Sequence, residues 1–193
     1  MEQIRTGDAL LVVDVQNDFL PGGTLAVPDG AAVIPVLSRY LALFHSKGLP
    51  IIATRDWHPS NHCSFREQGG PWPAHCIAQT AGAQFPANLQ LPPSVFIISK
   101  GDDPTQEAYS GFQDTLLHAH LQTVGVTRLF VGGLTTDYCV LQTVRDARSL
   151  GYRVCLLTDG TRAVNVRPDD GRKAQEEMVR LGAVPLHLEQ LAA

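Results

Sequence analysis

The chain has 193 residues and a formal net charge of −4, with 44% hydrophobic and 18% charged residues. This length suits one α/β domain with a sizeable core, and the lack of a basic run argues against a nucleic-acid-binding protein. No apolar stretch is long enough to span a membrane, and the N-terminal segment lacks a signal-peptide pattern because Asp8 and Asp14 flank its apolar part. Without an export signal, the four cysteines are expected to be reduced thiols, which predicts a cytoplasmic protein.

Six apolar runs predict the strands of a sheet, and they lie at residues 9–15, 50–54, 95–99, 128–131, 153–157 and 184–188. Most are continuously apolar and rich in Val, Ile and Leu, which is typical of parallel strands covered on both faces. Helical patterns lie between several of them and end at Gly48, Gly125, Gly151 and Gly182. This alternation predicts an α/β fold with a doubly wound, mainly parallel six-stranded sheet and helices on both faces, as a single domain over residues 1–193.

The segment 57–93 has no sustained periodicity and is rich in Pro, Gly, His, Trp and Phe. Loops of this length are uncommon in compact domains and are usually functional or disordered. The aromatic residues and histidines argue against disorder. We therefore expect an ordered insertion, at about residues 57–93, that covers an active site.

Polar residues follow the predicted strands at the edge where an open α/β sheet binds its ligands. Asp14 ends the first strand, Lys100 follows the third, and Cys139 follows the fourth after a turn at Gly132 and Gly133. Each has a structural explanation when taken alone: Asp14 as a helix cap or magnesium ligand, Lys100 as a solvated charge, and Cys139 as a small core residue. Together they favour nucleophilic catalysis, with Cys139 as nucleophile, Asp14 as proton carrier and Lys100 as electrostatic support.

Cys139 also lies at or near the predicted N-terminus of a helix. The backbone amides and the helix dipole at such a position favour a thiolate over a thiol, and the thiolate is the nucleophilic form. We therefore expect the local field to activate Cys139.

A second group of polar residues has the composition of a metal site. Asp56 and His58 are separated by one residue, His62 follows four residues later, and His75 lies in a more distant part of the loop. One carboxylate and two histidines that leave coordination positions open suit zinc, iron or manganese. We predict Asp56, His58 and His75 as ligands, with His62 either a fourth ligand or a structural residue. The alternatives are that the histidines are surface residues, or that cysteines of the same loop share a zinc ion with them, which the cysteine spacing does not favour.

Five segments carry a resemblance to a known family, and they are LLVVDVQNDFLPGGTLAV, ATRDWHPSNHCSF, PWPAHC, SKG followed by AYSGF, and GGLTTDYCV. They cover most of the chain and resemble the nicotinamidase (pyrazinamidase) family of isochorismatase-like cysteine hydrolases. The resemblance implies a catalytic triad at Asp14, Lys100 and Cys139. It also implies a divalent metal, zinc first and iron or manganese as alternatives, held by the predicted carboxylate and two histidines.

The resemblance further implies a non-proline cis peptide between Leu134 and Thr135. Such a bond would direct the backbone amides of Thr135 and Cys139 at a developing oxyanion. The substrate pocket would be walled by four side chains, Phe19, Trp72, Leu134 and Tyr109. Aromatic residues bury strongly, so the alternative is that these side chains simply fill the core.

The activity implied by the resemblance is hydrolysis of nicotinamide to nicotinate and ammonia through a cysteine thioester, with the pyridine nitrogen on the metal, in NAD salvage. Pyrazinamide is a second candidate substrate, and a homo-oligomer is compatible with the sequence. Three alternatives remain: a related cysteine amidase acting on a carbamoyl or ureido group, a non-catalytic zinc-binding or redox-sensing protein, and a phosphatase with Asp14 as nucleophile. The phosphatase is the weakest because no glycine loop that could cradle a phosphate is present at that turn.

Overall fold

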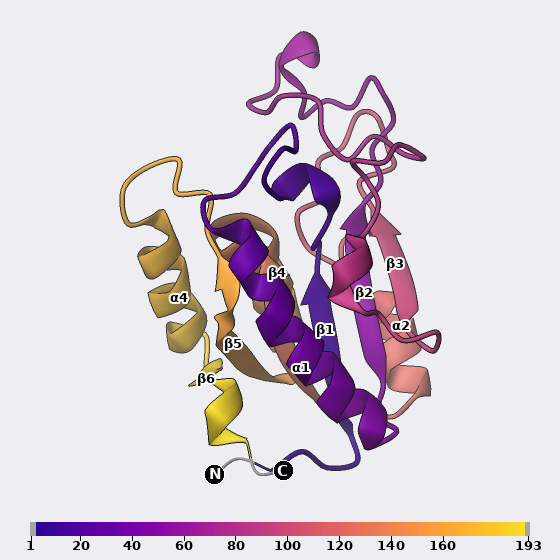
Figure 1. The fold of residues 1–193 in the computed structure, drawn as a ribbon, viewed down its shortest axis with the longest axis vertical. Helices are drawn as coiled ribbons and strands as arrows, with labels where there is room; N and C mark the ends of the chain where they lie inside the picture. The colour runs from indigo at the N-terminus through magenta and orange to yellow at the C-terminus, as the bar shows by residue number, and fades with distance from the viewer. Residues whose placement is uncertain (1–2, 192–193) are drawn as a thin grey trace.

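The structure is a computed structural model and describes residues 3–191. Its centre is one six-stranded sheet in the order β3-β2-β1-β4-β5-β6, and each neighbouring pair is parallel (Figure 1). The strands are β1 Asp8–Val13, β2 Ile51–Asp56, β3 Phe96–Lys100, β4 Arg128–Leu134, β5 Arg153–Arg162 and β6 Val184–Leu186. The predicted parallel, doubly wound sheet is confirmed.

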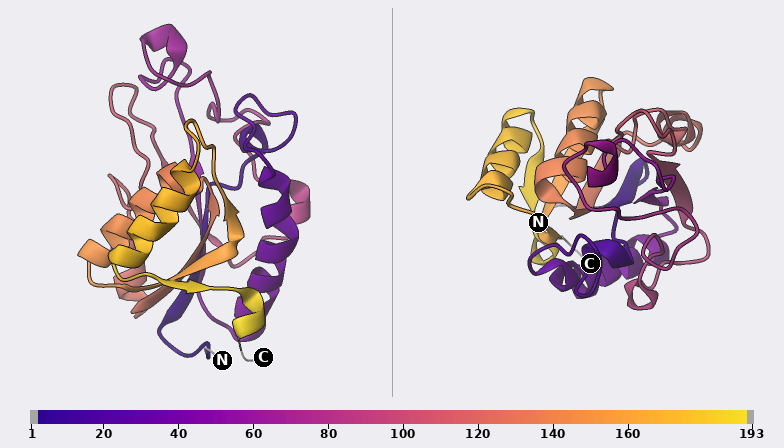
Figure 2. Two further views of the ribbon diagram at one scale, coloured as in Figure 1. Left: turned by 90° about the vertical axis from the view of Figure 1, so that its left-hand side faces the viewer. Right: turned by 90° about the horizontal axis from the view of Figure 1, so that it is seen from above.

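Four α-helices cover the two faces of this sheet: α1 Val33–Ser46, α2 Leu117–Thr123, α3 Leu141–Ser149 and α4 Asp170–Arg180. Helix α1 packs on one face, whereas α2, α3 and α4 pack on the other, as both views of Figure 2 show. No helix in the described range of the chain is long and apolar enough to cross a membrane.

Strand β1 shows why the apolar runs are continuous. Leu10 and Val12 belong to the core cluster on the α1 side, and Leu11 and Val13 belong to the cluster on the opposite side. All four side chains are fully buried. Both faces of the central strands are therefore covered by helices, so no polar face is needed.

Strand β4 extends beyond its predicted end at residue 131 and reaches Leu134. Gly133 has φ 126°, and a Cβ atom there would lie 2.1 Å from the carbonyl oxygen of Val13. Glycine is therefore required for β4 to continue alongside β1 at this point. The result is that the chain leaves the sheet only at Leu134, next to the polar residues that follow β1.

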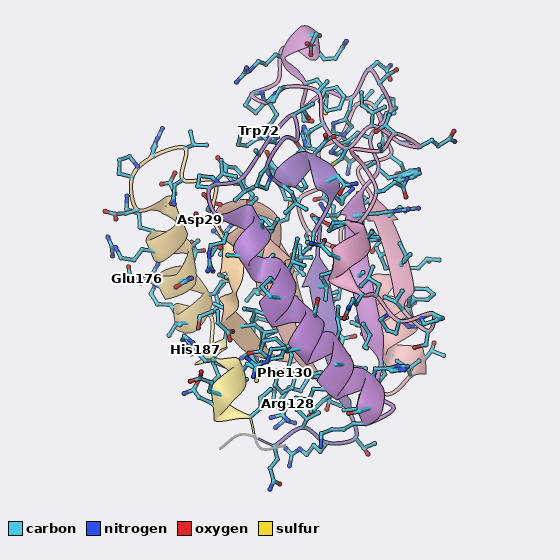
Figure 3. All side chains as sticks on the ribbon, viewed as in Figure 1. Asp29, Trp72, Arg128, Phe130, Glu176 and His187 are labelled. Atoms are coloured by element: carbon cyan, nitrogen blue, oxygen red, sulfur yellow. The ribbon has the colours of Figure 1, made fainter. Side chains whose placement is uncertain are left out.

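Most of the insertion at 57–93 lies beyond the carboxyl ends of the strands, in the upper part of Figure 1, whereas its Ala87–Leu89 turn packs against α1. Its regular structure consists of two short helical turns, Arg66–Gln68 and Ala87–Leu89, and isolated bridges that join His58 to Ile77 and Phe65 to Trp72. Trp72 lies in this upper region in Figure 3, whereas Arg128 lies near the opposite end of the sheet. The insertion is thus placed where the sheet edge brings the candidate catalytic residues together.

Candidate active site

Three strands bring the predicted catalytic residues together. Asp14 directly follows β1, Lys100 is the last residue of β3, and Cys139 lies in a π-helical turn, Thr136–Val140, that leads from β4 into α3. The Nζ atom of Lys100 lies 2.9 Å from Oδ2 of Asp14 and 3.6 Å from Sγ of Cys139. The parallel sheet therefore gathers a carboxylate, an ammonium and a thiol from separate parts of the chain.

Asp14 is fully buried and has a backbone φ of 47°. The Thr54 hydroxyl donates a hydrogen bond of 2.6 Å to its Oδ1 atom. Its Oδ2 atom faces Lys100 in the ion pair, but no donor in the described part of the chain meets Oδ2 with hydrogen-bond geometry. Burial raises the pKa of the Asp14 carboxyl, the Lys100 charge opposes this increase, and the charge of Asp56 adds to it. A raised pKa brings an aspartate closer to the range that suits a general base near neutral pH.

Lys100 is also fully buried and joins the two carboxylates of the site. Besides its pair with Asp14, its Nζ atom lies 2.5 Å from Oδ1 of Asp56 and donates to the carbonyl oxygen of Ala108 at 3.0 Å. Burial alone would lower the pKa of Lys100, but the charges of Asp14 and Asp56 raise it well above its usual range. Lys100 is therefore a permanent cation that makes two buried carboxylates tolerable.

The predicted activation of Cys139 by the helix field is opposed by the surroundings of the thiol in the folded chain. Burial raises the pKa of the Cys139 thiol well above its usual value, and although the Lys100 charge lowers it, the charges of Asp14 and Asp56 raise it further. Burial and two nearby carboxylates thus outweigh the effect of a helix start. A neighbouring base that accepts the thiol proton would therefore favour the nucleophilic form of Cys139.

The predicted metal ligands lie next to this group. Asp56, His58 and His75 each offer one ligand atom, and these atoms lie within 4.8 Å of one another. The Nδ1 atom of His58 lies 2.7 Å from the carbonyl oxygen of Gly101, and that of His75 lies 2.8 Å from the carbonyl oxygen of Pro73. Each Nδ1–H therefore donates to a backbone carbonyl, so Nε2 is the atom of each ring that can bind a cation, and Nε2 of His58 lies 3.7 Å from Oδ2 of Asp56. The donor set fits a divalent metal.

Gln16 holds the candidate ligand Asp56 in place. Its Oε1 atom accepts the backbone N–H of Asp56 at 2.7 Å, and its Nε2 atom donates to the carbonyl oxygen of Asp56 at 2.8 Å. Burial would raise the pKa of the Asp56 carboxyl, but the positive charges of Lys100 and His58 lower it overall. Asp56 is thus held rigidly and ionised, as a metal ligand must be.

His62, the candidate fourth ligand, uses both ring nitrogens within the protein. Its Nδ1 atom lies 2.8 Å from Oγ of Ser64, and its Nε2 atom lies 3.1 Å from the carbonyl oxygen of Gln106. Its ring stacks on that of His58, with centroids 4.0 Å apart. In this arrangement His62 supports the His58 ring. It could bind a metal held by Asp56, His58 and His75 only after one of its two ring nitrogens lost its hydrogen bond.

A cavity adjoins Cys139, and it is lined by Phe19, Leu25, Asp56, Trp72, His75, Tyr109, Thr135, Tyr138, Cys139 and Val164. Three of the four predicted wall residues, Phe19, Trp72 and Tyr109, are among them. The indole N–H of Trp72 donates to the Tyr109 hydroxyl at 3.0 Å, and its ring packs edge-on against Tyr138. The walls are therefore aromatic and braced against one another.

The prediction that Leu134 lines the pocket is wrong. Its side chain is fully buried in the core cluster on the α1 side and is not part of the cavity lining. Sequence reasoning missed Leu25, Tyr138 and Val164. Tyr138 could have been found from its position beside Cys139, but Leu25 and Val164 come from separate loops and carry no local signal.

The peptide bond between Leu134 and Thr135 is cis, as predicted. The carbonyl oxygen of Thr135 accepts the N–H groups of Tyr138 at 3.2 Å and Val140 at 3.0 Å. These bonds fold the turn that carries Cys139 around Thr135. Thr135 and Cys139 consequently line the same cavity.

The Isochorismatase domain family model matches residues 8–190. This chain belongs to the isochorismatase family. The chain is 41% identical to the nicotinamidase of Escherichia coli (strain K12) over 91% of its length and 92% of that protein. Among solved structures, the isochorismatase domain described here is similar to the pyrazinamidase of Pyrococcus horikoshii in complex with zinc, with TM-score 0.90, 47% identity and coverage of 94% of this chain and 99% of that one. It is also similar to PnC1 from L. infantum in complex with nicotinate, with TM-score 0.87, 38% identity and coverage of 97% and 96%.

Proposed function

We propose that this chain is a nicotinamidase, which hydrolyses nicotinamide to nicotinate and ammonia and thereby serves NAD salvage. The observation that carries the proposal is the position of Cys139, which lies against Lys100 at 3.6 Å and opens into an aromatic cavity shared with Asp56 and His75. Nicotinamide has a flat ring for the aromatic walls, a ring nitrogen for the metal side and a carboxamide for the thiol. The similarity to proteins named nicotinamidase and pyrazinamidase supports the same conclusion.

Acylation begins with proton transfer from the Cys139 thiol to Asp14. The sulfur attacks the carboxamide carbon, and the backbone amides of Thr135 and Cys139 stabilise the oxygen that takes the negative charge. Collapse of this tetrahedral species breaks the C–N bond, and Asp14 returns its proton to the nitrogen, so that ammonia leaves. Lys100 remains charged throughout and stabilises the ionised form of Asp14 and the developing thiolate.

Deacylation uses the same base for a second substrate, water. Asp14 takes a proton from the water molecule as its oxygen attacks the thioester carbon. The C–S bond then breaks, Asp14 returns the proton to sulfur, and nicotinic acid leaves and ionises to nicotinate by losing a proton to solvent. The resting thiol of Cys139 and the carboxylate of Asp14 are thereby restored.

Asp56, His58 and His75 would hold a divalent cation, for which we propose zinc. When bound, the cation supplies a Lewis-acidic position that holds the pyridine nitrogen and so fixes the ring. The protein residues supply the remaining alignment: Phe19 and Trp72 flank the cavity and restrict how a flat ring can enter. Pyrazinamide also has a ring nitrogen in the meta position relative to its carboxamide. We therefore propose it as a second substrate.

Ammonia release from a panel of amides tests this proposal. Nicotinamide should be hydrolysed much faster than benzamide, which has the same carboxamide and ring shape but lacks the ring nitrogen. A ureido or carbamoyl compound serves as the third member of the panel. Preference for that compound over nicotinamide would show that the chain is a different amidase. Equal rates on nicotinamide and benzamide would refute the proposed contact between the ring nitrogen and the metal.

A further inference from the structure

Thr135 carries a buried hydroxyl that the reaction described above does not use. The residue is 4% exposed, and its Oγ1 atom has no hydrogen-bond partner among residues 3–191. The next residue, Thr136, is equally buried, but its hydroxyl is hydrogen-bonded to that of Thr161 at 2.8 Å. Buried polar groups in native proteins are nearly always paired, so the unpaired hydroxyl of Thr135 calls for a functional explanation.

The only other buried side-chain atom in this condition, within the described residues, is Oδ2 of Asp14. That atom belongs to the proposed base, and it lies 2.9 Å from the Nζ atom of Lys100 in an ion pair. Both residues lie around Cys139, but only the Thr135 hydroxyl lacks a polar partner among residues 3–191. Oδ2 of Asp14 is an acceptor, whereas the hydroxyl of Thr135 can donate.

Thr135 lies at the reacting end of the cavity. It lines the cavity together with Cys139, and its carbonyl oxygen accepts the N–H groups of Tyr138 and Val140, the two residues that flank the nucleophile. A ring held between the aromatic walls with its carboxamide at the sulfur brings that carboxamide, and not the ring, next to Thr135.

We propose that the Thr135 hydroxyl contacts the reacting carboxamide and donates a hydrogen bond to the oxygen that becomes negative when Cys139 attacks. This inference deepens the proposed function and depends on it for the identity of the amide. A hydroxyl donates more strongly to an oxyanion than to a neutral carbonyl, so the contact is stronger in the transition state than in the substrate complex. Its loss should therefore lower kcat more than it raises KM.

Two substitutions at this position separate the hydroxyl from the shape of the side chain. Thr135→Val removes the hydroxyl and keeps the branched shape, and we expect kcat for nicotinamide to fall roughly 10- to 100-fold with little change in KM. Thr135→Ser keeps the hydroxyl and should retain most of the activity. Because the hydroxyl has no hydrogen-bond partner in the part of the chain that the structure describes, Thr135→Val should melt at the same temperature as the parent or higher.

Thr136→Val is the matched control, because it removes a neighbouring buried hydroxyl that is paired with Thr161. This variant should melt at a lower temperature while its kcat stays close to that of the parent protein. A purely structural role for Thr135 predicts the same pattern for Thr135→Val, with lower melting temperature and retained kcat. That result would overturn the inference.

Binding of nicotinaldehyde, measured by calorimetry, gives a readout that does not depend on turnover. The thiol proton passes to Asp14 as the Cys139 sulfur bonds to the aldehyde carbon. The C=O π bond opens and its electron pair moves to oxygen, so the adduct carries a negative oxygen where the oxyanion forms. Thr135→Val should bind the aldehyde more weakly by a factor similar to its loss in kcat/KM, and unchanged aldehyde affinity would contradict the inference. A parent protein that releases no ammonia from nicotinamide would instead contradict the proposed function, and the aldehyde affinities would still test the hydroxyl.

Discussion

Replacing Thr54 with valine tests whether Asp14 acts as the base. The Thr54 hydroxyl donates a 2.6 Å hydrogen bond to Oδ1 of Asp14, and this bond lowers the pKa of a carboxyl that burial raises. A hydrogen bond to a charged group contributes about 1.5–3 kcal/mol, which corresponds to roughly 10- to 160-fold in an equilibrium or a rate. Loss of the bond should therefore raise the pKa of Asp14 further and reduce the fraction of the carboxylate form at a given pH.

The sign of the effect follows from the role of the carboxylate. A base works only when it is ionised, so kcat/KM falls as the pH drops through the pKa of Asp14. In Thr54→Val this acid limb should move toward higher pH by about one to two pH units, and the loss of activity should shrink as the pH is raised. The assay is ammonia release from nicotinamide across the pH range with matched metal content.

Thr143→Val is the control for a general loss of packing. The Thr143 hydroxyl is also fully buried and accepts the N–H of Gly111 at 2.9 Å, but it does not touch Asp14. It should lower the stability without moving the acid limb. If the acid limb of kcat/KM lies at the same pH in Thr54→Val and in the parent protein, Asp14 is not the titrating base and the reasoning fails.

Three further results are expected. Lys100→Met should lower the free energy of unfolding by about 3–5 kcal/mol, because Asp14 and Asp56 would lose the cation they share. An unchanged midpoint of urea unfolding would refute this prediction. Chelation and dialysis should abolish ammonia release, and added zinc should restore it. Full activity in a metal-free preparation would show that hydrolysis does not need the metal. Asp137→Ala should raise KM for nicotinamide several-fold with kcat nearly unchanged, because the Asp137 carboxylate accepts the N–H of the wall residue Val164 at 3.0 Å. Equal KM values for the variant and the parent protein in steady-state kinetics would exclude this positioning role.

The meeting of Asp14, Lys100 and Cys139 could be predicted from the sequence because parallel strands end at one edge of a sheet. Each residue follows a strand whose apolar run is visible in the chain, so the topology alone brings them together. The insertion at 57–93 was predicted to cover the site on other grounds, from its length, its lack of periodicity and its aromatic and histidine content. The pairing of Lys100 with Asp56 was not predicted, because it depends on β2 and β3 being neighbours in register, where Asp56 lies opposite Lys100.

The groups that raise the pKa of the Cys139 thiol could not be predicted from its local sequence. A helix start is visible in the chain, but complete burial and the two carboxylates come from residues far away in the sequence. Leu134 was misplaced for a related reason. The residue adjoins the turn at Cys139, yet its side chain points to the core side of the sheet while the backbone of Thr135 continues to the cavity.

The measurement that tests the central claim most directly is ammonia release from nicotinamide by Cys139→Ala, compared with the parent protein at equal metal content. Loss of the nucleophile should lower kcat by at least about 10³-fold, because the thioester can no longer form. Cys63→Ala, which changes a half-buried cysteine outside the cavity lining, should keep its activity and controls for the loss of any thiol. Ammonia release by Cys139→Ala at the rate of the parent protein would contradict the account.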